Sequence, residues 1–288
     1  MGGGTYSFAD RTVRASSLGY DTKSAQEIFT SRDINNAMNP NGVDIRESCD
    51  SDEHPNSLAI VLALDVTGSM GSIPHHLVKE GLPEVMDGII QKGVKDPQVL
   101  FLGIGDHECD RAPLQVGQFE SSDELLDKWL TDIWIEGGGG GNNGESYMLA
   151  WYFAANHTTI DCFNKRKEKG FLFTVGDEPT LRELPKGALK TIMGSSQPES
   201  TTAAELLDKA RERYNVYHLH VMEGNNGRRQ EVMDGWKQLM GEDNLILVGK
   251  HRDIPSIIAD IVTKNKEVSA SEAGLTKKKP EEKIEEML

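Results

Sequence analysis

The sequence is poor in cysteine, in basic side chains and in long apolar runs, and each scarcity excludes a class of protein. The three cysteines, Cys49, Cys109 and Cys162, form no Cys-x-x-Cys pair, which favours free thiols in a reducing cytoplasm over a disulfide framework. The formal net charge of −15 leaves no basic face for nucleic acid. No apolar run approaches the roughly 20 residues that span a bilayer, and the first residues lack the apolar core of a secretory signal. We therefore expect a cytoplasmic protein that binds neither nucleic acid nor a membrane.

Short, continuous apolar segments recur along the chain and are typical of strands buried on both faces. They occur at residues 58–64, 99–104, 171–175, 216–221 and 245–248. Helical patterns occupy the intervals between and after them, at 74–92, 122–131, 145–156, 181–193, 201–213, 228–240 and 253–265. This alternation predicts an α/β fold with a Rossmann-like, doubly wound and mostly parallel sheet that has helices on both faces. Residues 113–120 alternate in polarity and predict one short antiparallel edge strand.

Composition divides the chain into three segments. Residues 1–55 are polar and rich in Gly, Asn, Asp and Ser, which predicts an irregular N-terminal arm that lies on the domain or joins a partner. Residues 56–266 carry the predicted strands and helices and form the folded domain. Residues 267–288 are charged and rich in small side chains, which predicts a flexible C-terminal tail.

Oxygen-bearing side chains follow several of the predicted strands. Asp65, Thr67 and Ser69 come directly after the first strand, Asp106 after the second and Asp177 after the third. Ligands of open α/β sheets bind beyond the carboxyl ends of the strands, so these side chains should converge on one rim. Oxygen ligands without a cysteine or histidine cluster suit Mg²⁺, with Mn²⁺ or Ca²⁺ as substitutes. Because hydroxyls are neutral, an ion held in part by them stays electrophilic towards an outside carboxylate.

The motifs at these strand ends carry a family resemblance. DVTGSMG, after an apolar strand, resembles the Asp-x-Ser/Thr-x-Ser element of the metal-ion-dependent adhesion site (MIDAS) of von Willebrand factor type A domains, and TVGDEP resembles that family's later strand with a metal-site aspartate. GIGDHECD and EGGGGGNNGES are similar to the bacterial and α-kinase-associated branch, in which a Gly-rich loop precedes a glutamate. The resemblance covers residues 56–265. It implies a Rossmann-like sheet with a Mg²⁺ site on its upper rim, with metal roles for Asp65, Thr67, Ser69 and Asp177.

The middle loop departs from the family pattern because it holds no threonine. Asn142, Asn143, Glu145 and Ser146 are the candidates to supply the missing oxygen, and water is the further alternative. Asp106 ends a strand as Asp65 does, which makes it a candidate to support the ligands without binding the ion itself.

The resemblance implies a protein-binding module, not an enzyme, that uses its Mg²⁺ to engage a carboxylate of the partner protein. Intracellular bacterial members of the family often work with AAA+ ATPases of the MoxR type, so the resemblance implies such an ATPase as the partner.

Other interpretations of these motifs stay open. DVTGS is close to the Asp-Lys-Thr-Gly-Thr motif of haloacid-dehalogenase-like phosphohydrolases, in which Asp65 would be the nucleophile and Mg²⁺ would bridge it to phosphate. Val66 counts against this alternative, because that family has a lysine there or a second aspartate one residue later. A scaffold with a degenerate metal site is another alternative. Asp65, Thr67 and Ser69 can also form a plain Asx-turn and helix cap, and Asp177 can cap a helix that starts at Pro179.

Overall fold

A six-stranded sheet forms the centre of the molecule, in the order β10-β9-β6-β2-β3-β4. Every neighbouring pair is parallel except β3 and β4, which are antiparallel. The strands are β2 (Leu58–Asp65), β3 (Pro97–Ile104), β4 (Leu114–Val116), β6 (Gly170–Gly176), β9 (Tyr214–Val221) and β10 (Leu245–Val248). The predicted mostly parallel sheet with an antiparallel edge strand is therefore confirmed. The computed structural model describes residues 4–20, 22–77, 81–137, 142, 144–196 and 199–276.

The central strands are largely apolar because both of their faces are covered. Every residue of β2, β3 and β6 is buried. The parallel register pairs Ile60 with Phe171 and Leu64 with Val175. This register brings the carboxyl ends of β2 and β6 side by side, so the side chains that follow Asp65 and Gly176 meet at one rim of the sheet.

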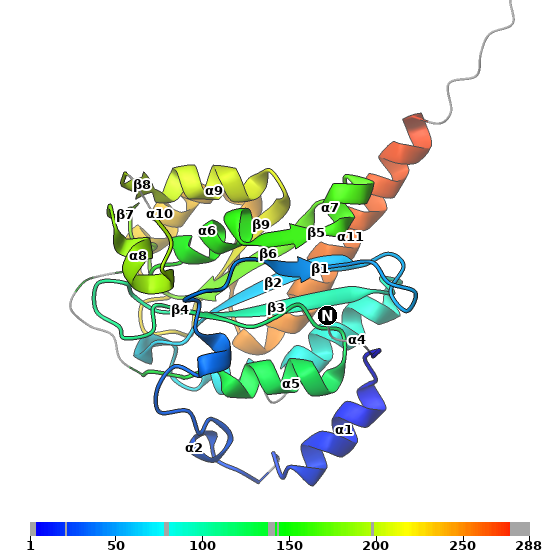
Figure 1. Ribbon diagram of the computed structural model, residues 1–288, viewed down its shortest axis with the longest axis horizontal. Coiled ribbons are helices and arrows are strands. Elements are labelled where there is room, and N and C mark those ends of the chain that lie inside the picture. The colour runs from blue at the N-terminus through cyan, green and yellow to red at the C-terminus, as the bar shows by residue number, and fades with distance from the viewer. Residues whose placement is uncertain are drawn as a thin grey trace, which may run out of the picture.

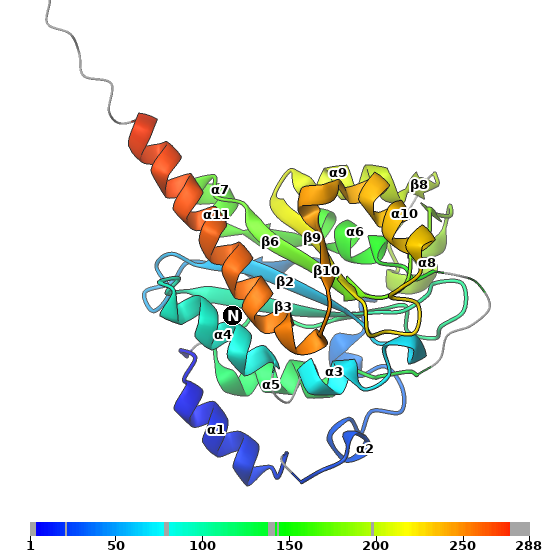
Figure 2. The same cartoon turned by 180° about the vertical axis from the view of Figure 1, so that it is seen from behind.

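Helices cover both faces of the sheet (Figures 1 and 2). On one face, apolar side chains of β2, β3 and β6 meet those of three helices: α4 (Leu82–Gln91), α5 (Asp123–Asp132) and α11 (Ile254–Thr276). The helices of the other face are α6 (Met148–Asn156), α7 (Asp161–Arg166), α9 (Ala203–Arg211) and α10 (Gln230–Met240). Most of α6 is buried, which explains its almost uniformly apolar sequence.

Two of the predicted helices differ from the observed elements. The pattern at 74–92 becomes two helices, α3 (Ile73–His76) and α4, with residues 78–80 outside the described part. The prediction for 181–193 is wrong in its first half, where β7 (Glu183–Leu184) pairs antiparallel with β8 (Thr201–Thr202). Helix α8 starts only at Ala188, because the residue before it, Gly187, has left-handed backbone (φ 81°) that a right-handed helix cannot include.

Helix α11 is longer than the pattern at 253–265 predicts. It continues to Thr276, so residues 267–276 of the predicted tail are helical. Its far end projects away from the body of the molecule (Figure 1). Residues 277–288 lie outside the described part. Among the described residues, no helix is both long and apolar enough to cross a membrane.

Among its described residues, the N-terminal arm contains four short regular elements, of which the sequence pattern indicated only the short helix within residues 20–32. They are α1 (Phe8–Ser17), α2 (Ala25–Ile28), the short 3₁₀ helix η1 (Asn36–Met38) and β1 (Arg46–Ser48), which pairs in parallel with β5 (Thr158–Ile160). The arm lies against the domain through α1, whose buried Arg11 forms an ion pair of 3.2 Å with Asp127 of α5. Tyr20 also donates its hydroxyl proton to Asp127, over 2.9 Å.

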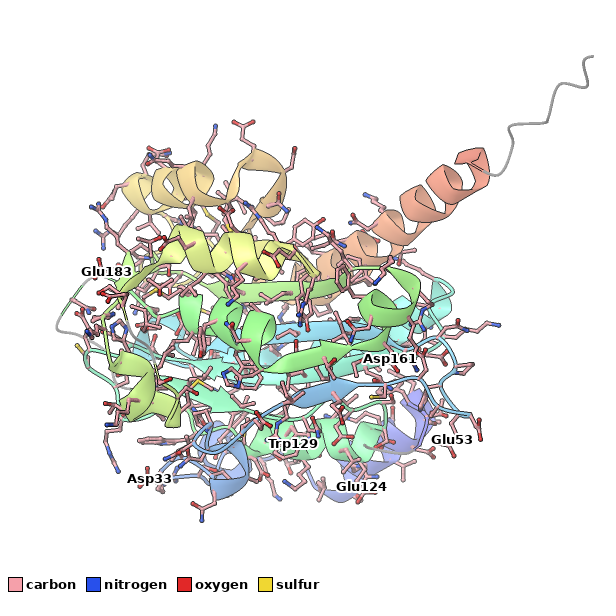
Figure 3. All side chains as sticks on the ribbon, turned by 45° about the horizontal axis from the view of Figure 1, so that its top comes forward. Asp33, Glu53, Glu124, Trp129, Asp161 and Glu183 are labelled. Carbon is pink, nitrogen blue, oxygen red and sulfur yellow. The ribbon has the colours of Figure 1, made fainter. Side chains whose placement is uncertain are left out.

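Acidic side chains lie at both ends of the molecule. Figure 3 labels Glu183 at one end of the molecule and Glu53 and Asp161 at the other. Of the acids near the rim of the sheet, Asp65, Asp106, Glu145 and Asp177 are distinguished by their burial.

Candidate metal centre

Asp65 is the last residue of β2, and the chain turns sharply around its carboxylate. The backbone N–H of Thr67 donates to Asp65 Oδ1 over 2.9 Å, and the Thr67 hydroxyl donates to the same oxygen over 2.6 Å. The first bond forms the Asx-turn that the alternative interpretation of these residues, a plain Asx-turn and helix cap, expects. The helix cap of that interpretation is absent, because Thr67 precedes the short 3₁₀ helix η2 (Gly68–Met70) without a side-chain bond to it.

Ser69 extends this turn to the neighbouring strand β6. Its hydroxyl donates to Asp177 Oδ1 over 2.7 Å, and its oxygen lies 3.2 Å from the hydroxyl oxygen of Thr67. Asp65, Thr67, Ser69 and Asp177 therefore form one continuous chain of oxygens, as the sequence predicts. Each hydroxyl has a single proton and directs it to a carboxylate, so the Thr67 and Ser69 oxygens face each other with lone pairs. Two such oxygens between two carboxylates are a donor set that fits a cation.

Asp177 follows β6 and is held in place from the loop after β9. It accepts a hydrogen bond of 2.8 Å from the backbone N–H of Asn226 to Oδ2. The alternative of a cap on a helix at Pro179 is wrong, since no helix begins there. The loop approaches so closely that a Cβ on Gly224 would lie 2.5 Å from Asp177 Cγ. Sequence reasoning missed this role of Asn226, although the Gly- and Asn-rich segment after a parallel strand was a signal that a loop returns to the same rim.

Tyr147 is the second residue that sequence reasoning missed. Its hydroxyl donates to Asp65 Oδ2 over 2.7 Å from the start of α6, and its side chain is fully buried. Asp65 thus accepts three hydrogen bonds. Burial raises the pKa of Asp65 to about 6, against the lowering effect of the bonds from Thr67 and Tyr147. The apolar helical pattern after Tyr147 gave no sign that its polar end reaches a strand-end carboxylate.

Two further acids lie around this chain of oxygens, the buried Glu145 and the half-buried Glu178. Burial raises the pKa of Glu145 to about 10, and the neighbours that raise it further are all carboxylates, Asp65 first. Burial likewise raises the pKa of Glu178 to about 7, with Asp177 as the next cause and with Arg229 opposing. One carboxylate oxygen of Glu145 and one of Glu178 are buried without a hydrogen-bond partner. A cation at this rim would compensate both the charge and the missing contacts.

The other residues predicted near the middle-loop position are engaged elsewhere, apart from Glu145. The Ser146 hydroxyl oxygen accepts a hydrogen bond of 2.9 Å from the backbone N–H of His107. Asn142 donates to Glu108, and Asp106 accepts from the backbone of Glu108 within its own loop. Asn143 and the glycines at 138–141 lie outside the described residues.

Glu145 is fixed at the rim by its backbone. Its N–H donates to Pro179 O over 2.9 Å, and its carbonyl accepts from Leu181 N–H over the same distance. The middle loop is therefore paired to the segment that directly follows Asp177 and Glu178.

In the part of the chain that the structure describes, no group of three or more His, Cys, Asp or Glu side chains is arranged to hold a metal ion. A site made of three or more such side chains differs from the site predicted here. The predicted set has only two carboxylates, Asp65 and Asp177, and takes its other oxygens from Thr67 and Ser69.

Comparison with known proteins finds no matching family model and no matching curated sequence. Among solved structures, the pilus adhesin SpaC from Lactobacillus rhamnosus GG aligns with a TM-score of 0.48 at 9% identity, over 77% of this chain and 31% of that one. Proximal thread matrix protein 1 from the mussel byssus, in a form with a zinc-occupied MIDAS motif, gives 0.44 at 11% identity, over 73% and 47%. An aerotolerance-related membrane protein from Bacteroides fragilis gives 0.43 at 13% identity, over 72% and 99%.

This chain thus spans about a third of the adhesin and about half of the byssus protein. At these scores and identities, the similarities do not assign a function to it.

Proposed function

We propose that this chain is a protein-binding module that holds a divalent cation, Mg²⁺ in the cell, and engages a carboxylate of its partner through that ion. The chain of oxygens from Asp65 to Asp177 carries the proposal, because its two hydroxyl oxygens face each other with lone pairs between two carboxylates. The sequence resemblance to the MIDAS of von Willebrand factor type A domains supports it independently.

Each residue has a distinct part in this proposal. Asp65, Thr67 and Ser69 hold the ion from the turn after β2, and Asp177 holds it directly or through water from the end of β6. Tyr147 fixes the orientation of the Asp65 carboxylate, and Asn226 does the same for Asp177. The bound ion supplies the positive charge that allows a protein of net charge −15 to accept an acidic side chain.

The proposed partner is a protein with an exposed glutamate or aspartate. An AAA+ ATPase of the MoxR type is the class that the family resemblance implies, and a cytoplasmic location goes with it.

A thermal-shift measurement tests whether the cation binds. We expect millimolar Mg²⁺ to raise the melting temperature of the wild-type chain over its value in EDTA, by mass action worth about 2.7 kcal/mol at one hundred times the Kd. Asp65→Asn should abolish the increase, because it removes a charge without changing the shape of the side chain. Asp208→Asn, an exposed change on α9, is the matched control and should keep it. Equal melting temperatures in EDTA and Mg²⁺ for the wild type would show a scaffold with a degenerate site.

A pull-down separates cation binding from partner binding. A partner captured by the wild type in Mg²⁺ should be released by EDTA and should not be captured by Asp65→Asn. The proposal fails if the same protein is retained in EDTA.

The phosphohydrolase alternative gains no support from the geometry, because Asp65 is fully buried and both of its oxygens accept hydrogen bonds. Hydrolysis of p-nitrophenyl phosphate by the wild type, lost in Asp65→Asn, would establish it nevertheless.

A further inference from the structure

A groove of about 630 Å³ opens beside the candidate metal centre, between the segment after β6 and helices α9 and α10. Its lining comes from three stretches of chain: Pro179, Thr180 and Arg182; Thr202, Ala203 and Ala204; and Glu231, Gly235, Trp236, Gln238 and Leu239. The groove is anchored to the centre, because the Trp236 indole donates to the carbonyl of Glu178 over 2.9 Å. Pro179 and Thr180 directly follow Asp177 and Glu178, so one wall of the groove continues the rim that holds the candidate ligands.

Gly235 of α10 lines the groove and leaves space there, because it has no side chain. It lies in the middle of α10, where glycine costs about 0.5–1 kcal/mol relative to alanine. A Cβ at this position would meet nothing within 4 Å, so no neighbouring element requires a glycine there. The missing side chain leaves a hollow in the surface of the helix between Glu231 and Leu239, which lie one turn to either side on the same face.

Arg182 supplies a positive charge at the edge of the groove. Its side chain is exposed, and among the described residues no carboxylate lies within ion-pair distance of it. The acid that lines the groove, Glu231, is paired with Arg229 over 2.8 Å. The groove therefore combines apolar surface from Ala204 and Leu239 with an available guanidinium, in a chain whose overall charge is strongly negative.

We propose that the groove binds an extended segment of the partner protein in which acidic residues flank an apolar one. This inference rests on the proposed function: one carboxylate reaches the ion at the rim, the apolar side chain occupies the hollow over Gly235, and the second carboxylate pairs with Arg182. Charge complementarity selects an acidic segment, and the shared wall at Pro179 connects it to the ion. Specificity then depends on the spacing between the acidic and apolar residues.

Fluorescence polarisation with labelled peptides tests the proposal. The probes are fluorescein-labelled nonapeptides in a Gly-Ser background, each with one leucine between two aspartates at spacings of one to three residues. At least one should bind in 1 mM Mg²⁺, and replacing its leucine by serine should abolish binding. Gly235→Leu, which fills the hollow, and Arg182→Glu should each weaken binding about tenfold or more. Lys95→Glu, a reversal of an exposed charge just before the amino-terminal end of β3 and so at the end of the strands opposite the rim, should change it less than twofold.

Two further measurements separate a failure of the groove proposal from a failure of the ion proposal: the Mg²⁺-dependent thermal shift of the variants, and peptide binding in EDTA and by Asp65→Asn. All three variants should retain the Mg²⁺-dependent thermal shift, which shows that fold and ion site are intact. If no probe binds the wild type, or if Gly235→Leu and Arg182→Glu bind like the wild type, the groove proposal is wrong while the ion proposal stands. If binding depends on Gly235 and Arg182 but is equal in EDTA and in Asp65→Asn, the groove is a docking site and the ion proposal fails.

Discussion

At the scale of single residues, the acids around Asp65 make the folded chain hold protons that the unfolded chain releases. An ordinary glutamate ionises near pH 4, whereas Glu145 in the folded chain has a pKa of about 10. Between these values the folded state binds one more proton than the unfolded state, so stability falls as the pH rises. Buried His218 and His220, whose pKa values are lowered mainly by burial, act in the opposite direction below about pH 7. Above that pH the histidines no longer contribute, whereas burial raises the pKa of the Cys49 and Cys162 thiols and so acts in the same direction as Glu145 near pH 9. The variant Glu145→Gln therefore assigns the share of Glu145.

We expect the free energy of unfolding in EDTA to decrease by about 1 kcal/mol per pH unit between pH 7.5 and 9. Glu145→Gln should remove most of this slope, because the amide stays neutral throughout. Urea unfolding at a series of pH values measures it. Glu199→Gln, an exposed substitution, should leave the slope as in the wild type. Parallel curves for Glu145→Gln and the wild type would show that Glu145 is already ionised in the folded chain.

The residues of the site that sequence reasoning identified are the ones whose signal is local. Asp65, Thr67 and Ser69 sit at alternate positions of one turn, directly after an apolar strand, and Asp177 ends a strand of the same kind. Tyr147 could not be identified this way. Its contact with Asp65 depends on how α6 packs over the sheet, which no short stretch of sequence encodes.

At the scale of elements, the loop after β9 determines whether Asp177 points into the site. Gly224 has no side chain, and the loop uses that space to bring the N–H of Asn226 onto the carboxylate. Gly224→Ala should displace Asp177 and cost about 1–3 kcal/mol of stability. It should also reduce the thermal shift produced by Mg²⁺. Gly249→Ala, in the next strand-end loop where a Cβ has nothing within 4 Å, should do neither. An unchanged response in Gly224→Ala would mean that Asp177 does not contribute to cation binding.

Most elements of the sheet were predictable because buried parallel strands leave continuous apolar runs. The elements that were not predicted are short or lie outside those runs, and they include α1 in a polar segment, and β7 and β8 with two residues each. Strands of two residues have no periodicity. Their pairing is fixed by the turn and the helix that they connect, which are tertiary features.

At the scale of the whole molecule, the N-terminal arm is fixed to the domain by a buried charge. Arg11 on α1 is paired with Asp127 on α5, and both side chains are almost fully buried. Arg11→Met should destabilise the chain by about 3 kcal/mol, because it leaves the aspartate buried and unpaired. The double variant Arg11→Met, Asp127→Leu should recover most of this loss, since no uncompensated charge remains. Thermal or urea unfolding of the two variants measures it. An equal loss in both would show that the arm is held by packing alone.

The order of the strands also determines when, during synthesis of the chain, the site can form. β2 and β6 are neighbours in the sheet, yet Ser69 and Asp177, which join across them, are 108 positions apart in the chain. At a synthesis rate of 5–20 residues per second, the turn after β2 leaves the ribosome about 5–20 seconds before the aspartate that completes the pair. During that interval β2, which is apolar from Leu58 to Leu64, has no neighbour on its β6 side. The nascent chain therefore carries an exposed, aggregation-prone strand edge until the last part of its own ion site has been made.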